Sequence, residues 1–591
     1  MCGIVGIFSN QNSLHQKIDE AINNIHHRGP DFQTSKKINK NLSFGHARLA
    51  IVDLNERSHQ PFYDAKTGNY IIFNGEIYNY KELKKLLPHR EFHTNSDTEI
   101  LLYLLSDLNP KEVLNQCNGM FAFALWKEKE QMLVLGRDRF GKKPLFFTHN
   151  SEGLKFASES KALRPLGVNF EVNHEAVINY IFEITIGKNE QSFFKDIYQL
   201  KNGCLAIYTI NHEGNIIHEK TERYWNYPKQ TRKISYLDAV DEFRSLIKKA
   251  VNTRLAEEVD FAIMISGGLD SSTIASFAAE FNPDKKITSI SAIYPGDEKD
   301  ESYYAKMVTE KYKNLNPVWI DDIDHKKFNE TIKSVIYHLE CPIADGSLIA
   351  QHVLMKKISE MGIKVILSGN GGDEVLAGYL TIFNPPKEIE DLKAGKLSIP
   401  SVRTFYHMLP NNIKNYIYRN KHKKLGILTY NHILGKIWKR FTDYGTNDLL
   451  NNYLINGLEH WTLPNLMWYE DRNSMAASIE SRCPFLDFQL VEFLLQLPAS
   501  FKIEKGFSKQ ILRDAAKGIV PQPILDRTDK QGFHAPTDKW VEHIDKNFLK
   551  DLDFKTEFDY LNLSKIEKAP FRMFWRTYTL YLWYKEFIKK E

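Results

Sequence analysis

The spacing of apolar residues changes part-way along this chain, and that change limits the folds it can adopt. Up to about residue 210, short apolar runs alternate with turn signals, a pattern typical of β-rich structure. From about residue 237, strand-like apolar runs alternate with helix-like periods, which indicates a parallel sheet covered by helices. Because 591 residues exceed what one hydrophobic core supports, we expect the two patterns to form separate domains.

A linker is predicted where the two patterns meet. Residues 211–215 form a polar turn sequence, and the charged and aromatic residues that follow show no clear period. The predicted organisation is a first domain over 1–210, a linker over 211–236 and a second domain over 237–591. The predicted strands of the first domain are 4–8, 43–52, 70–73, 120–126, 132–135 and 145–148. In the second domain we predict strands at 261–265, 287–293 and 365–367, helices over 271–280 and 350–361, and mostly helical structure from about 400.

The composition excludes some classes of partner. Lys and Arg total 78 and Asp and Glu total 74, so the net charge of +4 gives no global field to attract nucleic acid or an anionic membrane. The densest basic run, 419–424, is predicted to be a solvated helix end or loop. No apolar run approaches the roughly 20 residues of a membrane span, and the first residues lack the features of a signal peptide. We therefore expect neither a nucleic acid nor a membrane as partner.

The five cysteines are widely scattered along the chain. An odd and unpatterned set argues against a disulfide framework and fits a reducing cytoplasm, so we predict a cytoplasmic protein. No CxxC pair is present, and a structural zinc site is therefore not expected. The five are Cys2, Cys117, Cys204, Cys341 and Cys483.

Cys2 stands out among the cysteines because of its position. If Met1 is removed, this residue carries a thiol nucleophile and a free α-amino group, whose ordinary pKa is about 7.7–8.0. Near pH 7 a sizeable fraction of that amine is neutral and can accept the thiol proton. This arrangement is the N-terminal-nucleophile form of covalent catalysis. The alternative is an ordinary buried thiol near a chain end.

Two further features of the first domain have both a structural and a functional interpretation. Asn74-Gly75 is the favoured two-residue hairpin turn, yet an Asn amide and a Gly N–H can also form an oxyanion hole. Arg48 has the chemistry to bind a carboxylate bidentately, and Asp97 has the chemistry to hold an ammonium. Taken singly, each of these residues is more typical of a turn or of an exposed charge.

Six short motifs occur in order through the first domain: CGI at 2–4, RGPD at 28–31, RLAIVD at 48–53, NGEIYN at 74–79, GMFAFA at 119–124 and RDRFG at 137–141. Together they resemble a class II, N-terminal-nucleophile glutamine amidotransferase domain. The resemblance implies a four-layer αββα sandwich that hydrolyses glutamine. It also implies the roles of six residues: Cys2 as the nucleophile, Asn74 with Gly75 as the oxyanion hole, Arg48 at the α-carboxylate of glutamine, and Glu76 with Asp97 at its α-amino end.

A loop rich in glycine and serine, SGGLDSS at 266–272, lies where the predicted strand 261–265 gives way to a helix. Glycines let a backbone approach a phosphate closely, and a helix N-terminus supplies N–H donors and the positive end of a dipole. Asp270 would repel a bare phosphate, so its presence suggests Mg²⁺ between the two. The structural alternative is a glycine-rich turn with a Ser or Asp cap. The predicted phosphate site consists of Ile265, Ser266, Gly267, Gly268, Asp270, Ser271 and Ser272.

A second loop, LSGNGGDE at 367–374, also follows a predicted strand. In a parallel sheet both loops would lie at the carboxyl ends of strands, where ligands bind. Ser368 and Gly369 would then add to the phosphate site, and Asp373 would share the magnesium with Asp270. Together the two loops resemble an ATP-pyrophosphatase domain, which cleaves ATP between its α and β phosphates and so adenylates a carboxylate.

Three later motifs extend the likeness: EDRNSMA at 470–476, ESRCPFLD at 480–487 and SKQILR at 508–513. In this order they resemble the synthetase half of glutamine-dependent asparagine synthetase, and the likeness covers nearly the whole chain. The implied fold class is a two-domain combination of α/β and α+β, with an αββα first domain and a helix-rich, parallel-sheet second domain. By the same resemblance Lys509 would stabilise negative charge in the adenylation transition state, with ATP and Mg²⁺ required.

Asn370 departs from the family pattern. Many asparagine synthetases carry Glu at this third position of the second loop, where it is thought to act as a base or to stabilise an intermediate. An amide cannot take a proton at physiological pH. Either a neighbour such as Glu374 substitutes for the missing carboxylate, or the acceptor differs.

We therefore expect an ATP-dependent enzyme whose substrates are glutamine, ATP and a carboxylic acid, with aspartate as the favoured acceptor. The first alternative is amidation of another carboxylate, such as a sugar uronic acid of surface polysaccharides. The second is a regulatory or binding protein that retains glutaminase activity only, against which Asp270, Asp373 and Lys509 argue. The sequence leaves the oligomeric state open, with a homodimer as one candidate.

Overall fold

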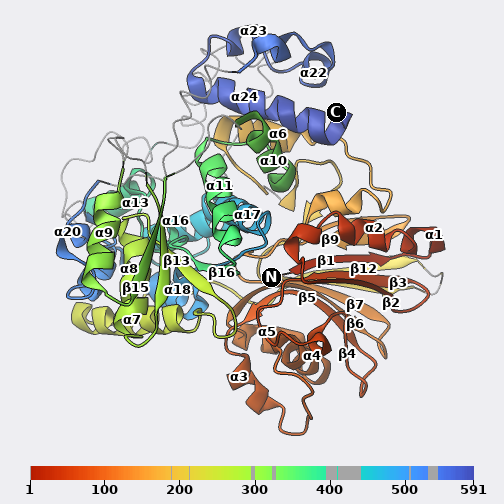
Figure 1. The fold of residues 1–591 in the computed structure, drawn as a ribbon, viewed down its shortest axis with the longest axis horizontal. Helices are drawn as coiled ribbons and strands as arrows, with labels where there is room; N and C mark the ends of the chain where they lie inside the picture. The colour runs from red at the N-terminus through yellow and green to blue at the C-terminus, as the bar shows by residue number, and fades with distance from the viewer. Residues whose placement is uncertain are drawn as a thin grey trace.

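The structure is a computed structural model that describes residues 2–187, 190–211, 213, 215–293, 300–321, 328–393, 409, 441–504, 507–529 and 544–590. Met1 and the predicted basic run 419–424 lie outside these ranges. The described chain forms two units that meet side by side, and the start of the first strand lies at their junction (Figure 1).

Two antiparallel sheets of six strands each form the first unit. Apolar side chains of both sheets share one core, in which the rings of Phe8 and Trp126, one from each sheet, lie 5.5 Å apart. The first sheet has the order β10 (Tyr198–Gln199), β8 (Phe146–Asn150), β9 (Gly153–Ala157), β1 (Cys2–Phe8), β3 (Leu42–Arg48), β2 (Phe32–Lys37). The second has the order β12 (Ile216–Arg223), β11 (Cys204–Ile210), β7 (Met132–Arg137), β6 (Gly119–Lys127), β5 (Tyr70–Ile77), β4 (Phe62–Tyr63).

Helices cover the outer faces of both sheets. In α2 (Ile18–Asn23) the buried apolar residues follow a helical period, so one face packs against β1 and β3. On the other side α4 (Asp97–Asp107) packs against β5, and Figure 1 shows the two helices on opposite sides of the paired sheets. The predicted αββα sandwich is therefore confirmed. The other helices of this unit are α1 (Asn12–His15), α3 (Tyr80–Leu83), α5 (Pro110–Gln116) and α6 (His174–Glu183).

A five-stranded parallel sheet forms the centre of the second unit, as the strand–helix alternation predicts. Its order is β15 (Leu315–Ile320), β14 (Ile287–Ala292), β13 (Phe261–Met264), β16 (Val365–Leu367), β17 (Glu480–Arg482). Within the described residues, the α-helices before β17 are α7 (Tyr236–Asn252), α8 (Leu269–Glu280), α9 (Ser302–Lys311), α10 (Phe328–Leu339), α11 (Ser347–Glu360), α12 (Gly372–Val375), α13 (Leu380–Lys393), α16 (Leu449–Asn456) and α17 (Leu463–Met475). After it come α18 (Phe488–Leu495), the hairpin β18 (Ile503–Glu504) and β19 (Phe507–Ser508), α19 (Gln510–Ala515), α20 (Gln522–Leu525), α22 (Leu552–Glu557), α23 (Leu563–Ile566) and α24 (Phe571–Tyr584).

Two strands of this sheet escape the sequence analysis. β15 contains Pro317, and a proline in a sequence argues against a strand. It is tolerated here because β15 is an edge strand of the sheet. β17 has only three residues, two of them charged, and so offers no apolar run to detect. The predicted strands 261–265, 287–293 and 365–367 and the helices near 271–280 and 350–361 are confirmed within a few residues.

Two features of the first unit differ from what the local sequence patterns favour. Asn74-Gly75 does not form a hairpin turn, since both residues lie inside β5 and pair with Ala122 and Phe121 of β6. A linker beginning at 211 would cut a hairpin, because β12 pairs with β11 and continues the second sheet. We therefore propose that the first unit extends through Arg223.

The last α-helix of the described chain returns to the first unit. α24 packs against α10 and α6, and Arg576 Nη1 donates to the carbonyl of Ile181 at 2.8 Å. The two units are thus joined at this end as well as at the start of β1 (Figure 1). Among the described helices, none is both long enough and apolar enough to cross a membrane.

Candidate active sites

Cys2 begins β1, an inner strand of the first sheet. Its backbone N–H donates to Asn74 Oδ1 at 3.0 Å, so the nitrogen that would become the α-amine is held by the facing sheet. Across β3, Cys2 lies in register with Arg48. The side chain is buried, and burial raises the pKa of the Cys2 thiol. Formation of the thiolate near neutral pH therefore needs a base.

Asn74 and Gly75 have the properties of an oxyanion hole. With Oδ1 bound to Cys2, the other amide atom of Asn74, Nδ2, is buried and has no hydrogen-bond partner among the described residues. A buried donor without a partner costs about 1–3 kcal/mol, which a ligand oxyanion would recover. At Gly75 a Cβ would come within 2.1 Å of the Met120 carbonyl oxygen, so only glycine lets β5 approach β6 this closely.

Arg48 ends β3, and the loop that follows binds its guanidinium. Nη1 donates to the carbonyl of Asn55 at 2.8 Å, and Nη2 donates to the carbonyls of Val52 and Asp53. The loop folds back to make these bonds, which explains why the predicted strand 43–52 ends at Arg48. A guanidinium carries five donors, so three carbonyl bonds do not exhaust its capacity to bind a carboxylate.

Glu76 and Asp97 lie beside the oxyanion pair. Glu76 follows Gly75 in β5, and Asp97 begins α4, where its Oδ2 accepts from the Ile77 N–H at 2.9 Å. Burial raises the pKa of Asp97 to about 6, although that hydrogen bond opposes the shift. Burial also raises the pKa of Glu76 well above its ordinary value, although the Arg482 guanidinium opposes this. The structure thus gathers the predicted glutamine-site residues around the start of β1.

Arg28 belongs to this site, although the sequence analysis assigned it no role. Its Nε donates to the Cys2 carbonyl at 3.1 Å, and its two terminal nitrogens donate to both carboxylate oxygens of Asp471 at 2.8 and 3.1 Å. Nη1 of Arg28 also donates a hydrogen bond to the Glu159 carboxylate at 2.7 Å. Asp471 lies in α17, so the second unit helps to fix Cys2. Arg28 lies in the RGPD motif and Asp471 in the EDRNSMA motif. The two residues are 443 positions apart, and no local sequence pattern connects them.

The first loop of the second unit connects β13 to α8, as predicted. Ser271 Oγ accepts from the Ser266 N–H at 3.1 Å and lies 3.0 Å from Ser266 Oγ, which closes the loop on itself. Gly267 has a φ of 82°, and a Cβ there would come within 2.5 Å of the Glu301 carbonyl oxygen. Gly268 is the residue before the first turn of α8. The backbone N–H groups at this helix start suit a phosphate. The adjoining predicted residues, Ile265 and Ser272, are buried.

The second loop lies against the first. A Cβ at Gly369 would come within 3.0 Å of the Ser271 nitrogen, and one at Gly372 within 2.6 Å of the Asp270 carboxyl carbon. Ser368 N–H donates to the carbonyl of Arg482 at 2.9 Å, which fixes the start of this loop on β17. Because β13 and β16 are neighbouring parallel strands, both loops leave the same edge of the sheet.

Lys509 joins the two loops. Its ammonium pairs with Asp270 Oδ2 and with Asp373 Oδ1, the latter at 2.7 Å. Burial opposes the charged form, but the two carboxylates raise the pKa of Lys509 above its ordinary value. The residue is 6% exposed and lies just before α19 with a φ of 58°, a left-handed conformation that lysine rarely adopts. It is therefore neither solvated nor within the helix.

The residues around Lys509 fit a magnesium ion that arrives with a nucleotide. Mg²⁺ is usually held by one or two protein carboxylates together with substrate phosphates. Asp270 and Asp373 point at one ammonium from two loops, so they can also face one cation. The described residues contain no group of three or more His, Cys, Asp or Glu side chains suited to a metal.

Asn370 lies half-buried between Gly369 and Gly371, and no carboxylate takes its place in the loop. The nearest carboxyl group along the chain beyond Asp373 is Glu374, which is 1% exposed and is hydrogen-bonded to Tyr379.

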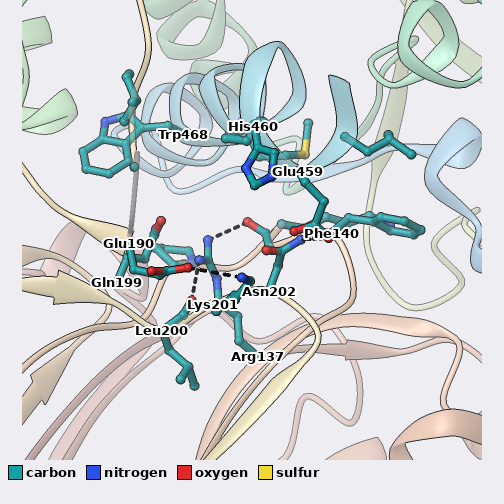
Figure 2. Close-up of a pocket in the computed structure, with 18 of the residues that line it drawn as sticks. Arg137, Phe140, Glu190, Gln199, Leu200, Lys201, Asn202, Glu459, His460 and Trp468 are labelled. Atoms are coloured by element: carbon teal, nitrogen blue, oxygen red, sulfur yellow. Dashed lines mark hydrogen bonds and ion pairs between the residues drawn. The ribbon is translucent and has the colours of Figure 1, made fainter. Parts of the chain in front are cut away.

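A cavity lies between the two units, outside both predicted sites (Figure 2). Its walls come from the loops after β7, α6 and β10 and from the π-helical turn η8 (Gly457–Trp461) with α17. Arg137 closes one wall by donating to the carbonyls of Leu200 and Lys143, each at 2.7 Å. Asp471 also lines the cavity, and it binds the Arg28 that holds the Cys2 carbonyl.

Sequence comparisons agree with this two-part arrangement. A family model described as a glutamine amidotransferase domain matches residues 1–225, and one described as asparagine synthase matches residues 242–583. The glutamine-hydrolyzing asparagine synthetase 1 of Bacillus subtilis (strain 168) is 29% identical over 590 residues, covering 95% of this chain and 91% of that protein. The amidase chry2 of Gibberella zeae is 26% identical, covering 89% of this chain and 86% of that protein.

A third relative, the putative glutamine-hydrolyzing asparagine synthetase 2 of Methanocaldococcus jannaschii, is 31% identical over 409 residues, covering 65% of this chain and 76% of that protein. The asparagine synthase match alone spans more than half of the chain. The predicted resemblance is therefore confirmed: the chain belongs to the asparagine synthase family of glutamine-dependent amidotransferases.

Proposed function

We propose that this enzyme adenylates aspartate with ATP and amidates it with ammonia released from glutamine, so that asparagine is the product. The observation that carries the proposal is the Lys509 ammonium held between Asp270 and Asp373, at the meeting point of two glycine-rich loops. A buried cation flanked by two carboxylates, at the carboxyl ends of parallel strands, supports a site for a nucleoside triphosphate with its metal ion.

Glutamine hydrolysis would use the residues around Cys2. The thiolate attacks the side-chain amide carbon of glutamine, and the oxyanion that forms accepts hydrogen bonds from Asn74 Nδ2 and the Gly75 N–H. The C–N bond then breaks, and ammonia leaves with a proton from the protonated α-amine of Cys2. Water hydrolyses the resulting thioester to glutamate. Arg48 would bind the α-carboxylate of glutamine, and Glu76 with Asp97 would bind its α-ammonium.

Adenylation would take place at the two loops. An oxygen of the acceptor carboxylate attacks the α-phosphorus of ATP, pyrophosphate leaves, and an acyl-adenylate forms. Backbone N–H groups at the start of α8 would hold phosphate oxygens, and Lys509 would stabilise the charge that develops on them. Mg²⁺, held by Asp270 and Asp373, would supply further neutralising charge. Ammonia then attacks the acyl carbon, and AMP leaves with loss of a proton.

Ammonia would pass between the sites along the interface of the two units. The cavity between the two units supports this route, because Asp471 in its wall binds Arg28, the residue that holds the Cys2 carbonyl (Figure 2). A buried route keeps ammonia unprotonated and away from bulk water.

A second acceptor is favoured by one observation. The loop carries Asn370 where a carboxylate is expected, and an amide there could donate a hydrogen bond to a different acid. The second candidate function is therefore amidation of another carboxylate, with sugar uronic acids as the class to test.

Pyrophosphate release from ATP tests both candidates in one experiment. The unmodified protein is supplied with ATP, Mg²⁺ and ammonia, and aspartate is compared with glutamate and with several uronic acids. The proposal expects aspartate to give the highest rate and asparagine to form in equal amount. A higher rate with another acid would identify that acid class as the acceptor. Glutamine hydrolysis without pyrophosphate release from any acid would instead favour a protein that retains glutaminase activity only.

A further inference from the structure

β17 belongs to the second unit, but its two charged residues reach the predicted glutamine site. Glu480 and Arg482 are each 1% exposed. The Arg482 guanidinium pairs with Glu76 through Nη2 and with Glu480 through Nε at 2.7 Å. Its third nitrogen, Nη1, donates to the carbonyl of Arg254 at 2.9 Å. All three nitrogens are bound, so the position of the guanidinium is fixed.

The charges around Glu76 favour the arrival of a cation. The groups that face it are Arg482 and Glu480 from β17, Asp97 from α4, and Tyr78, which follows β5. Glu76 and Glu480 thus share the Arg482 guanidinium, Asp97 adds a third carboxyl group, and Lys143 supplies further positive charge that acts on Glu480. Ionised carboxylates that are buried without enough positive charge are costly, and burial raises the pKa of Glu76 well above its ordinary value. A ligand ammonium beside Glu76 would restore the balance.

Backbone pairing sets the position of Arg482. β17 pairs with β16 in parallel, with Arg482 opposite Leu367, and the Arg482 carbonyl accepts from the Ser368 N–H at 2.9 Å. Ser368 is the start of the second loop of the nucleotide site. Arg482 therefore holds the second loop of the nucleotide site through its backbone carbonyl and holds Glu76 through its side chain.

We propose that Arg482 and Glu480 are positioning residues of the glutamine site, an inference that rests on the function proposed above. Arg482 holds the Glu76 carboxylate in the orientation that receives the α-ammonium of glutamine. Glu480 adds negative charge that the ammonium neutralises. The glutamine site is thus completed by the synthetase unit. Neither role involves the reacting amide, so loss of these side chains affects glutamine binding more than the chemical step.

Three variants test this proposal: Arg482→Gln, Arg482→Lys and, as a matched control, Arg576→Gln. Arg576 is also buried and bridges the units, but its guanidinium donates to the carbonyl of Ile181 in α6 at 2.8 Å. The measurements are KM and kcat for glutamine hydrolysis, with ammonia-dependent pyrophosphate release as the reference activity.

Loss of a charge-assisted bond to a buried carboxylate predicts a rise of roughly tenfold or more in the glutamine KM of Arg482→Gln. The kcat for glutamine should change by less than about threefold, as expected for a group that acts on binding. Arg482→Lys keeps the charge and should recover part of the loss. Arg576→Gln should leave the glutamine KM unchanged. The loss in glutamine use by Arg482→Gln should exceed any loss in ammonia use.

Three outcomes overturn the proposal. They are an unchanged glutamine KM in Arg482→Gln, an equal loss of glutamine-dependent and ammonia-dependent activity, and an equal rise of KM in Arg576→Gln. If Arg482→Gln does not fold, Glu480→Gln decides the question, because it removes the negative charge that the ammonium would neutralise and an unchanged glutamine KM in that variant is equally contrary. A lack of glutamine hydrolysis in the unmodified protein would refute the proposed function itself, and the inference with it.

Discussion

Asn74 and Asn370 are both amides in predicted sites, but they differ in burial and in hydrogen-bond partners, and therefore in the role each can have. Asn74 is fully buried, one of its amide atoms binds Cys2 and the other has no partner in the described part of the chain, as expected of an oxyanion donor. Asn370 is half-buried in a loop whose other features match the family. Its replacement of a carboxylate is therefore the residue-scale feature that bears most on the acceptor.

Asn370→Glu separates the two explanations of that residue. If aspartate is the acceptor and Asn370 merely slows the second step, the variant should form asparagine faster while adenylation changes little. If another acid is the acceptor, a glutamate would face a negative substrate at close range. Like charges about 4 Å apart cost on the order of 4 kcal/mol at an effective dielectric of 20, enough to weaken binding roughly a thousandfold. Pyrophosphate and amide product are measured with aspartate and with uronic acids.

An ordinary rate with aspartate that Asn370→Glu leaves unchanged would contradict both explanations and show that the position has no bearing on the acceptor. Asn316→Glu provides a matched control, since Asn316 lies in β15 and is exposed.

Glutamine binding should weaken in acid because the carboxylates that receive its ammonium take up protons. Burial raises the pKa of Asp97 to about 6, so this group is mostly ionised at pH 7 and mostly protonated at pH 5. A protonated carboxyl cannot pair with an ammonium, and the apparent affinity falls with the ionised fraction, about tenfold between these two pH values. Calorimetry on Cys2→Ala protein, which cannot turn glutamine over, measures this. A dissociation constant that is independent of pH would place the ammonium elsewhere.

At the scale of elements, short connections carry the chemistry and longer elements hold them in place. Both glycine-rich loops leave neighbouring parallel strands, and the junction of β19 with α19 brings a lysine to them. The left-handed conformation of Lys509 turns the chain sharply at that junction, and strained residues of this kind cluster at functional sites. Its backbone and its side chain therefore need separate tests.

Lys509→Ala and Lys509→Gly provide that separation. Both remove the ammonium, but glycine adopts the left-handed conformation without strain. If the ammonium stabilises charge in the transition state, both variants should lose roughly 100- to 1,000-fold in pyrophosphate release, with a smaller change in the KM for ATP. Lys517→Ala, which removes an exposed lysine two residues beyond α19, serves as the control. Recovery of activity in Lys509→Gly would show that the backbone turn, rather than the ammonium, is what matters.

At the scale of the whole molecule, local patterns were predictable and distant contacts were not. The phosphate loop could be placed because its glycines lie directly between an apolar strand and a helix. The partners that join the units are 443 residues apart for Arg28 with Asp471 and 406 apart for Glu76 with Arg482. Only the tertiary fold brings them together. Arg482 also lies in a three-residue strand with no apolar run, so its element was missed as well.

The Asn74-Gly75 pair shows that contacts within one unit also escape prediction from local sequence. A two-residue pattern favours a hairpin turn, and nothing local reveals that pairing with β6 extends the strand through it. The order of the six motifs, and not the pair alone, supported the functional interpretation. Site prediction from this sequence therefore depended on the resemblance, and the contacts between units came only from the structure.

The central claim is that one chain holds two sites, with ammonia made at the first and used at the second. Cys2→Ala tests it most directly, with product formation from glutamine and from ammonia measured side by side and Cys204→Ala as the control thiol. Because the thiol serves only ammonia release, the account predicts a loss of roughly 100-fold or more with glutamine and an ammonia-dependent rate within about twofold of the unmodified protein. Equal loss of both activities, or retained use of glutamine, would contradict it.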